Sequence, residues 1–148
     1  MIPKFRGKRV DTGEWVYGYL TFWNPYHAYI ADEGVWWYER TLIGDKAIPY
    51  TRGNLYRVDP STTGQFIGLK DRNNKEIYEG DIVEDIESDA RNNWGIITLD
   101  PDEWGEVFIT GNEDAFCYRD FLELIARGRI EVIGNIHDNP DLIAERQK

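Results

Sequence analysis

The chain has 148 residues, one cysteine and a formal net charge of −10 at pH 7. A domain of this length folds without metal or disulfides, and a single cysteine excludes an intramolecular disulfide. The charge argues against broad binding of phosphate backbones, because residues 75–148 hold 7 basic and 19 acidic side chains, whereas residues 1–74 hold 10 and 8.

The first part of the chain alternates between short apolar segments and turn residues. We expect strands over 4–10, 14–23, 26–31, 35–38 and 55–58, while 43–51 is ambiguous. Segment 14–23 is apolar on both faces of its pleat, with Val16 and Leu20 on the face opposite Trp15 and Tyr17. This pattern predicts a strand that is central in its sheet or is covered by another part of the protein.

Aromatic residues are concentrated in one segment, because residues 15–38 contain 10 of the 21 aromatics. They either cover the barrel of their own chain or form a surface that binds a protein partner, which could be a second copy of the chain. The candidate interface residues are Trp15, Tyr17, Tyr19, Trp23, Trp36, Trp37 and Tyr38.

The second half continues with strands and two short helices. We expect strands over 65–69, 76–78, 81–86, 94–99, 106–110 and 129–136. A helix near 117–127 follows from the spacing of Tyr118, Phe121, Leu122 and Ile125, with Gly128 just past its end. Proline at the first helical position predicts a terminal helix near 140–146. The fold class is mainly β (α+β), divided into an aromatic-rich part, 1–57, and a second part, 58–148.

Two patterns resemble metal sites. The stretch 71–82 begins like a calcium loop, but it has Glu76 where glycine is needed and Ile82 where a bidentate glutamate is needed, so a tight turn with positive φ at Asn73-Asn74 explains it better. A second carboxylate cluster suits either a hard divalent cation or an acidic, solvent-facing edge strand. Its members are Asp81, Asp85, Glu87 and Asp89.

No catalytic constellation stands out. Cys117 has no histidine near it in sequence, and His27 and His137 lie far apart along the chain, so a buried structural cysteine is the simpler interpretation. Zinc spacings and nucleotide-binding loops are absent from the sequence, and we expect no cofactor. Lys4, Arg6 and Lys8 share one face of a strand, where they could meet phosphate or the acidic half of the protein.

Three segments resemble the YopX protein family of phages and prophages. They are Lys4–Arg9 with Gly13–Leu20, then Val58–Val83, and finally Glu131–Ile136 with Asn139, Pro140 and Leu142. The resemblance implies an SH3-type barrel in the second half, preceded by a β-rich part, and a life inside a bacterial host cell. It brings no catalytic residues.

These observations favour a noncatalytic phage or prophage accessory protein that binds proteins or itself. One alternative is an acidic decoy, in which the carboxylates of 76–114 mimic DNA and occupy a host DNA-binding protein. A second alternative is an enzyme with a dispersed site. We expect a cytoplasmic protein, because residues 1–20 lack the pattern of a secretory signal and no window is apolar enough for a membrane span. Nucleic acid is not an expected partner.

Overall fold

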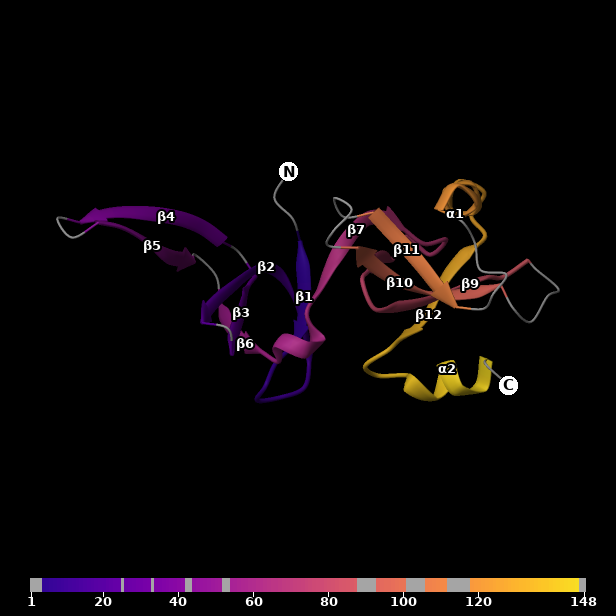
Figure 1. The fold of residues 1–148 in the computed structure, drawn as a ribbon, viewed down its shortest axis with the longest axis horizontal. Coiled ribbons are helices and arrows are strands. Elements are labelled where there is room, and N and C mark those ends of the chain that lie inside the picture. The colour runs from indigo at the N-terminus through magenta and orange to yellow at the C-terminus, as the bar shows by residue number, and fades with distance from the viewer. Residues whose placement is uncertain are drawn as a thin grey trace. The chain divides into compact units, whose positions relative to one another are not determined.

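The computed structural model describes residues 4–24, 26–32, 34–41, 44–51, 54–87, 93–100, 106–111 and 118–146 (Figure 1). The chain divides into two compact units, 1–65 and 66–148. Within the described residues the fold is mainly β, with two α-helices, as the sequence predicts. None of the described helices has the length and apolar character that crossing a membrane requires.

The first unit is built on an antiparallel sheet in the order β6-β3-β2-β1, extended by the start of β7. Its strands are β1 (Phe5–Lys8), β2 (Trp15–Asn24), β3 (His27–Ala31), β6 (Leu55–Val58) and β7 (Gly64–Lys70). A 3-10 helix, Pro60–Thr62, separates β6 from β7, and the Asp59 carboxylate accepts a hydrogen bond from the Ser61 N–H at its start. After this turn β7 returns to pair with β1, with Arg6 opposite Gly64.

The core of this unit lies on one face of the sheet. Ala28, Ile30 and Val58 are fully buried, and Val16 and Leu20 pack against them. β2 pairs with β1 on one side and with β3 on the other, so the prediction of a central strand is confirmed. Of the two apolar faces of β2, the one with Val16 and Leu20 packs on the core, while Tyr17 is 42% exposed.

Gly18 allows β2 to approach β3 closely. A side chain there would place its first carbon 2.0 Å from the backbone oxygen of Ala31, and the residue has φ of 153°. Glycine alone tolerates both the contact and the backbone angle without strain. A larger residue at position 18 would therefore force β2 and β3 apart.

A two-stranded hairpin is inserted between β3 and β6. β4 (Gly34–Thr41) and β5 (Gly44–Thr51) pair antiparallel along their whole length, from Gly34 opposite Thr51 to Thr41 opposite Gly44. Within the segment 43–51, which the sequence leaves ambiguous, residues Gly44–Thr51 are thus a strand. Among the described strands, β4 and β5 pair only with each other.

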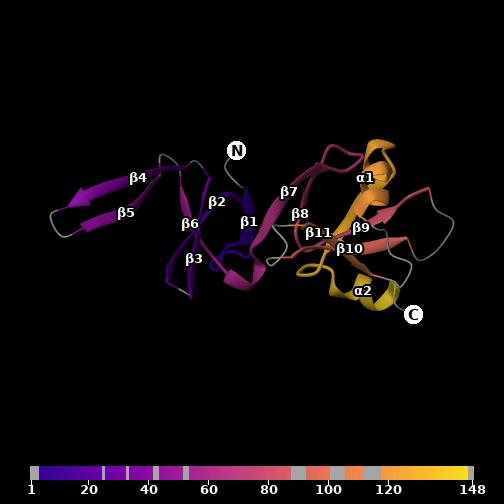
Figure 2. The same ribbon diagram turned by 45° about the horizontal axis from the view of Figure 1, so that its top comes forward.

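The second unit contains a four-stranded antiparallel sheet in the order β11-β10-β9-β12. Its strands are β9 (Asp81–Asp85), β10 (Trp94–Asp100), β11 (Glu106–Gly111) and β12 (Ile130–Asn135); β8 (Glu76–Tyr78) pairs with the later part of β7. The helices are α1 (Tyr118–Ala126) and α2 (Pro140–Arg146), which lie on opposite sides of this sheet in Figures 1 and 2.

The core of the second unit joins its sheet to α1. Ile77, Val83, Ile97, Phe121 and Ile130 are all fully buried. Gly128 follows α1 with φ of 69°, the left-handed geometry expected of a residue that ends a helix. Both predicted helices are therefore confirmed. The helix expected near 117–127 is α1, Tyr118–Ala126, and the helix expected near 140–146 is α2, Pro140–Arg146.

Asp71 ties the β7–β8 turn to β12. Its Oδ1 atom accepts hydrogen bonds from the Asn73 and Lys75 N–H groups at 2.8 and 3.0 Å, and its Oδ2 atom accepts one from the Val132 N–H at 3.0 Å. The Arg72 N–H adds a bond to the Ile130 carbonyl. Asn74 has φ of 64°, so the predicted tight turn is confirmed, with positive φ at Asn74.

Two features differ from the sequence-based expectations. β9 was expected at an acidic, exposed edge, but it lies between β10 and β12, and Asp81 and Asp85 are buried, so this prediction is wrong. The described strands form open antiparallel sheets, with one isolated bridge between Arg9 and Val58, so the SH3-type barrel is not confirmed. The predicted boundary at 57/58 stays a prediction.

Candidate functional site

The candidate site is the face of β1 and β2 opposite the core. The register places Arg6 beside Tyr17 and Lys8 beside Trp15, while a side chain at Gly7 would meet Val58 on the core side. Because side chains alternate along a strand, the predicted basic stripe and the predicted aromatic stripe fall on the same face. We call this surface the aromatic–basic face; it consists of Lys4, Arg6, Lys8, Trp15, Tyr17 and Tyr19.

Cations lie directly over the indole of Trp15. The Arg6 guanidinium carbon is 4.6 Å from the ring centroid, and the Lys8 ammonium is 5.4 Å from it. Arg6 is only 4% exposed, so this contact forms in a partly dry environment, where the attraction between a cation and a ring is stronger than in water. The pair fixes the Trp15 ring and gives the face a rigid centre.

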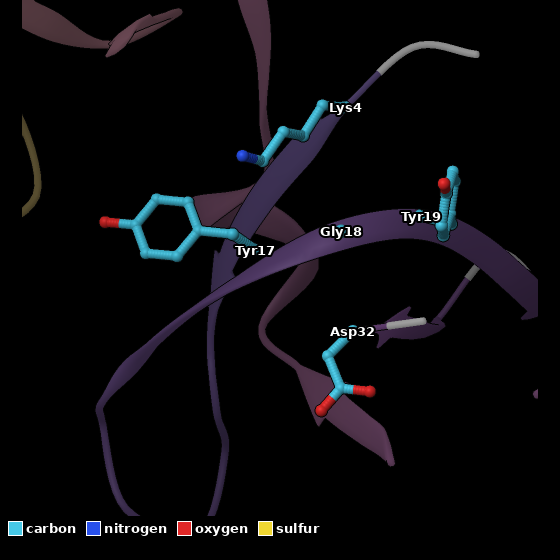
Figure 3. Close-up of a pocket in the computed structure, with 5 residues that line it drawn as sticks. All are labelled: Lys4, Tyr17, Gly18, Tyr19 and Asp32. Atoms are coloured by element: carbon cyan, nitrogen blue, oxygen red, sulfur yellow. The ribbon is translucent and has the colours of Figure 1, made fainter. Parts of the chain in front are cut away.

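A shallow depression of about 400 Å³ lies beside this centre (Figure 3). Lys4, Tyr17, Gly18, Tyr19 and Asp32 line it, and Figure 3 shows the Lys4 and Tyr17 side chains next to each other with Asp32 across the β2 strand. The Asp32 carboxylate accepts a hydrogen bond from the Asn54 N–H at 2.8 Å, which fixes its position. One cation, one anion and two phenol rings suit the polar backbone and mixed side chains of a peptide.

The turn that joins β1 and β2 is stabilised by its own ion pair. The Arg9 guanidinium donates two hydrogen bonds to the Asp11 carboxylate, at 2.9 and 2.7 Å, and lies 4.6 Å over the ring of Tyr56. The bonds to Arg9 hold the pKa of Asp11 below its usual value, and they raise the pKa of Arg9. The hairpin that carries the aromatic–basic face is thus held at its tip.

Some predicted interface residues are brought together and others are described only by their place in a strand. Trp15, Tyr17 and Tyr19 share the aromatic–basic face, and Tyr17 is 42% exposed. Trp23 lies near the end of β2, and Trp36, Trp37 and Tyr38 lie in β4. The sequence analysis missed Tyr26, which is 81% exposed at the β2–β3 turn; its place between turn residues Asn24 and His27 was the available signal.

In the acidic cluster, Asp81 and Asp85 bind other groups of the protein and so stabilise the fold. Asp81 is 1% exposed, and its Oδ2 atom accepts a hydrogen bond from the Tyr78 N–H at 2.8 Å. Asp85 accepts two bonds from the Arg129 guanidinium, at 2.9 and 2.6 Å, and these bonds raise the pKa of Arg129. Glu84 pairs with Arg146 at 2.6 Å and so attaches α2 to the sheet.

No metal site is assembled in the described part of the chain. Within those residues no group of three or more histidine, cysteine, aspartate or glutamate side chains is placed to hold an ion. Asp81 and Asp85 point to protein donors, Glu87 is exposed, and Asp89 lies outside the described residues. Of the four predicted surface carboxylates, Asp81 and Asp85 are therefore buried and Glu87 is exposed.

Of the residues considered for nucleophilic chemistry, the structure describes the two histidines. Cys117 lies outside the described residues. His27 has its Nδ1 atom 2.9 Å from the Asn24 side-chain oxygen, a contact that belongs to the β2–β3 turn. The His137 N–H donates to the Asn135 side chain at the end of β12. Both histidines thus belong to turn structures.

Comparison with known proteins identifies the family. The family model described as "YopX protein" matches residues 4–144, which is nearly the whole chain. The chain belongs to the YopX family. No curated protein matches it. A solved structure that resembles it is protein EF1440 from Enterococcus faecalis, with a TM-score of 0.55, 24% identity, and coverage of 97% of this chain and 99% of that one. This likeness concerns the fold alone.

Proposed function

We propose that this YopX-family protein is a noncatalytic accessory protein of a phage or prophage that binds a protein partner in the bacterial cytoplasm. The observation that carries the proposal is the aromatic–basic face, with Trp15 clamped under Arg6 and Lys8 and with Tyr17 open to solvent. Interfaces are enriched in tyrosine, tryptophan and arginine, and rigid aromatic side chains lose little entropy on binding.

The distribution of exposed apolar side chains supports the first unit as the binding unit. Seven large hydrophobic side chains are exposed in the described residues, and five of them lie in this unit: Val10, Tyr17, Phe22, Tyr26 and Leu55. The second unit exposes Leu122 and Ile136. These five side chains are the candidates for the apolar part of a contact surface on the first unit.

A co-purification experiment with matched variants tests this proposal. Tagged protein is expressed in host cells, and proteins that co-purify with the wild type are compared with those from Tyr17→Ala and from Leu122→Ala, whose parent side chains have similar exposures of 42% and 37%. We expect a stoichiometric partner that Tyr17→Ala loses and Leu122→Ala keeps. Thermal melts check that both variants fold. A partner that binds Tyr17→Ala as well as the wild type contradicts the proposal.

We also propose that the second half closes toward a small barrel of SH3 type. The support is topological: after the β9-β10-β11 meander, β12 returns to pair with β9. Closure requires a strand that joins the two outer strands of this sheet. An experimental structure that leaves both outer strands unpaired would rule out the barrel.

A further inference from the structure

The β4–β5 hairpin is a two-stranded sheet within the described fold. Such a sheet is marginally stable in water, and three or more strands are normally needed for stability. Four consecutive rungs pair apolar residues with each other: Val35–Tyr50, Trp36–Pro49, Trp37–Ile48 and Tyr38–Ala47. A sheet of this composition gains stability if a further strand joins it.

Pro49 decides which edge of the hairpin can accept a strand. Antiparallel rungs alternate between hydrogen-bonded pairs and pairs whose N–H and C=O groups point outward. Proline has no N–H, so it belongs on an outward rung. The rungs of Trp36–Pro49, Tyr38–Ala47 and Arg40–Asp45 are therefore the outward ones.

The outer edges of β4 and β5 therefore differ in their hydrogen-bond donors. The outer edge of β5 lacks a donor at Pro49, which protects an edge strand from pairing. The outer edge of β4 keeps the N–H groups of Trp36, Tyr38 and Arg40. β4 is thus the edge at which a strand can add.

We propose that β4 pairs antiparallel with β4 of a second copy of this chain, which gives a four-stranded sheet in the order β5-β4-β4-β5. A two-fold axis at Trp37 turns the aromatic segment Trp36–Tyr38 onto itself, so the edge is self-complementary. This register exchanges hydrogen bonds between Trp36 and Tyr38 of the partner subunit and sets the two Trp37 residues opposite each other. Glu39 and Arg40 leave β4 neutral, so the pairing meets no like charge within the strand.

This dimer goes beyond the proposed partner binding and is independent of it. The dimer uses the backbone edge of β4, whereas the partner would bind side chains on β1 and β2. Loss of one interaction therefore leaves the other in place, and the two experiments can fail separately.

Sedimentation and light scattering of the protein at tens of micromolar test whether it dimerises through the β4 edge. Tyr38→Pro removes an outward N–H from β4, and Ala47→Pro removes an outward N–H from β5 on the same rung. Tyr38→Ala keeps the N–H and removes only the ring. We expect dimers for the wild type, Ala47→Pro and Tyr38→Ala, and a monomer for Tyr38→Pro. A monomeric wild type, or a Tyr38→Pro variant that still dimerises, overturns the proposal.

A cross-link keeps the test valid if a proline variant fails to fold. In a Cys117→Ser background, Trp37→Cys places two thiols on the axis, at a non-hydrogen-bonded pair whose spacing permits a disulfide. Ile48→Cys is the control, because it occupies the same rung on β5. We expect a covalent dimer from Trp37→Cys under mild oxidation and a monomer from Ile48→Cys. Equal cross-linking of the two variants, or none in either, contradicts the β4 edge.

Discussion

At the scale of single residues, buried carboxylates carry much of the specificity of the second unit. The Asp85 side chain is 4% exposed and accepts hydrogen bonds from two of the three guanidinium nitrogens of Arg129, a residue 44 positions away in sequence. A paired charge is tolerable inside a protein, while one deprived of its partner is strongly destabilising. The Asp85–Arg129 contact therefore joins β9 to the entry of β12, and the loss of either partner alone is costly.

Removal of Arg129 should reveal this dependence. We expect Arg129→Met to lower the free energy of unfolding clearly more than the control below, because it removes the guanidinium that pairs with the buried Asp85 carboxylate. The matched control is Arg127→Met, since the Arg127–Glu123 pair is exposed on both sides and should change stability by about 0.5 kcal/mol or less. Urea denaturation followed by tryptophan fluorescence measures both. Equal effects of the two substitutions would contradict the assignment.

The same residues mark where sequence-based prediction succeeds. Strand and helix positions follow from alternation and capping, which are local signals: Gly128 and Asn74 have the positive φ that their contexts predict. The burial of Asp81 and Asp85 depends on β12, which pairs with β9 from far along the chain. A run of acids looks like an exposed edge until that pairing is known. The sequence predicts the basic residues of β1 and the aromatic residues of β2 separately. The pairing register that brings them onto one face is known only from the structure.

At the scale of elements, the β7–β8 turn is a structural connection between two distant strands. Asp71 is 7% exposed and closes the turn with one carboxylate oxygen while it holds Val132 of β12 with the other. The turn thus fixes the start of β12 as well as its own geometry. A residue that resembles a calcium ligand in sequence is in fact a cap for three backbone N–H groups.

Substitution of Asp71 should loosen both elements together. We expect Asp71→Ala to lower the free energy of unfolding by about 2–4 kcal/mol, because three backbone donors lose a charged acceptor. Asp71→Asn, which keeps one acceptor oxygen, should cost less. Lys75→Ala serves as the control, since that side chain is exposed in the same turn. Hydrogen exchange at Val132 should rise in Asp71→Ala; unchanged protection there would argue against the connection.

At the scale of the whole molecule, charge is distributed unevenly between the two units. Residues 66–148 hold 9 basic and 20 acidic side chains, whereas residues 1–65 hold 8 and 7. A unit with this excess of negative charge is destabilised by its own repulsion. The decoy hypothesis gains little from the excess, because several of these carboxylates are already used inside the fold.

Salt should therefore stabilise the protein. We expect the melting temperature to rise by a few degrees between low and moderate sodium chloride, because screening weakens repulsion among exposed carboxylates more than it weakens the buried Asp85–Arg129 pair. Differential scanning calorimetry measures the change. A melting temperature that falls with salt would mean that exposed ion pairs outweigh the repulsion.

Pro49 has a consequence for how far the protein can assemble. A sheet that accepts a further strand at both of its edges can grow without limit, and fibres of stacked strands form in this way. In the β4–β5 hairpin, one edge is open and the other lacks a donor. Sheet growth through this hairpin would therefore stop at four strands, so that a segment rich in tryptophan and tyrosine can remain at high concentration without polymerising.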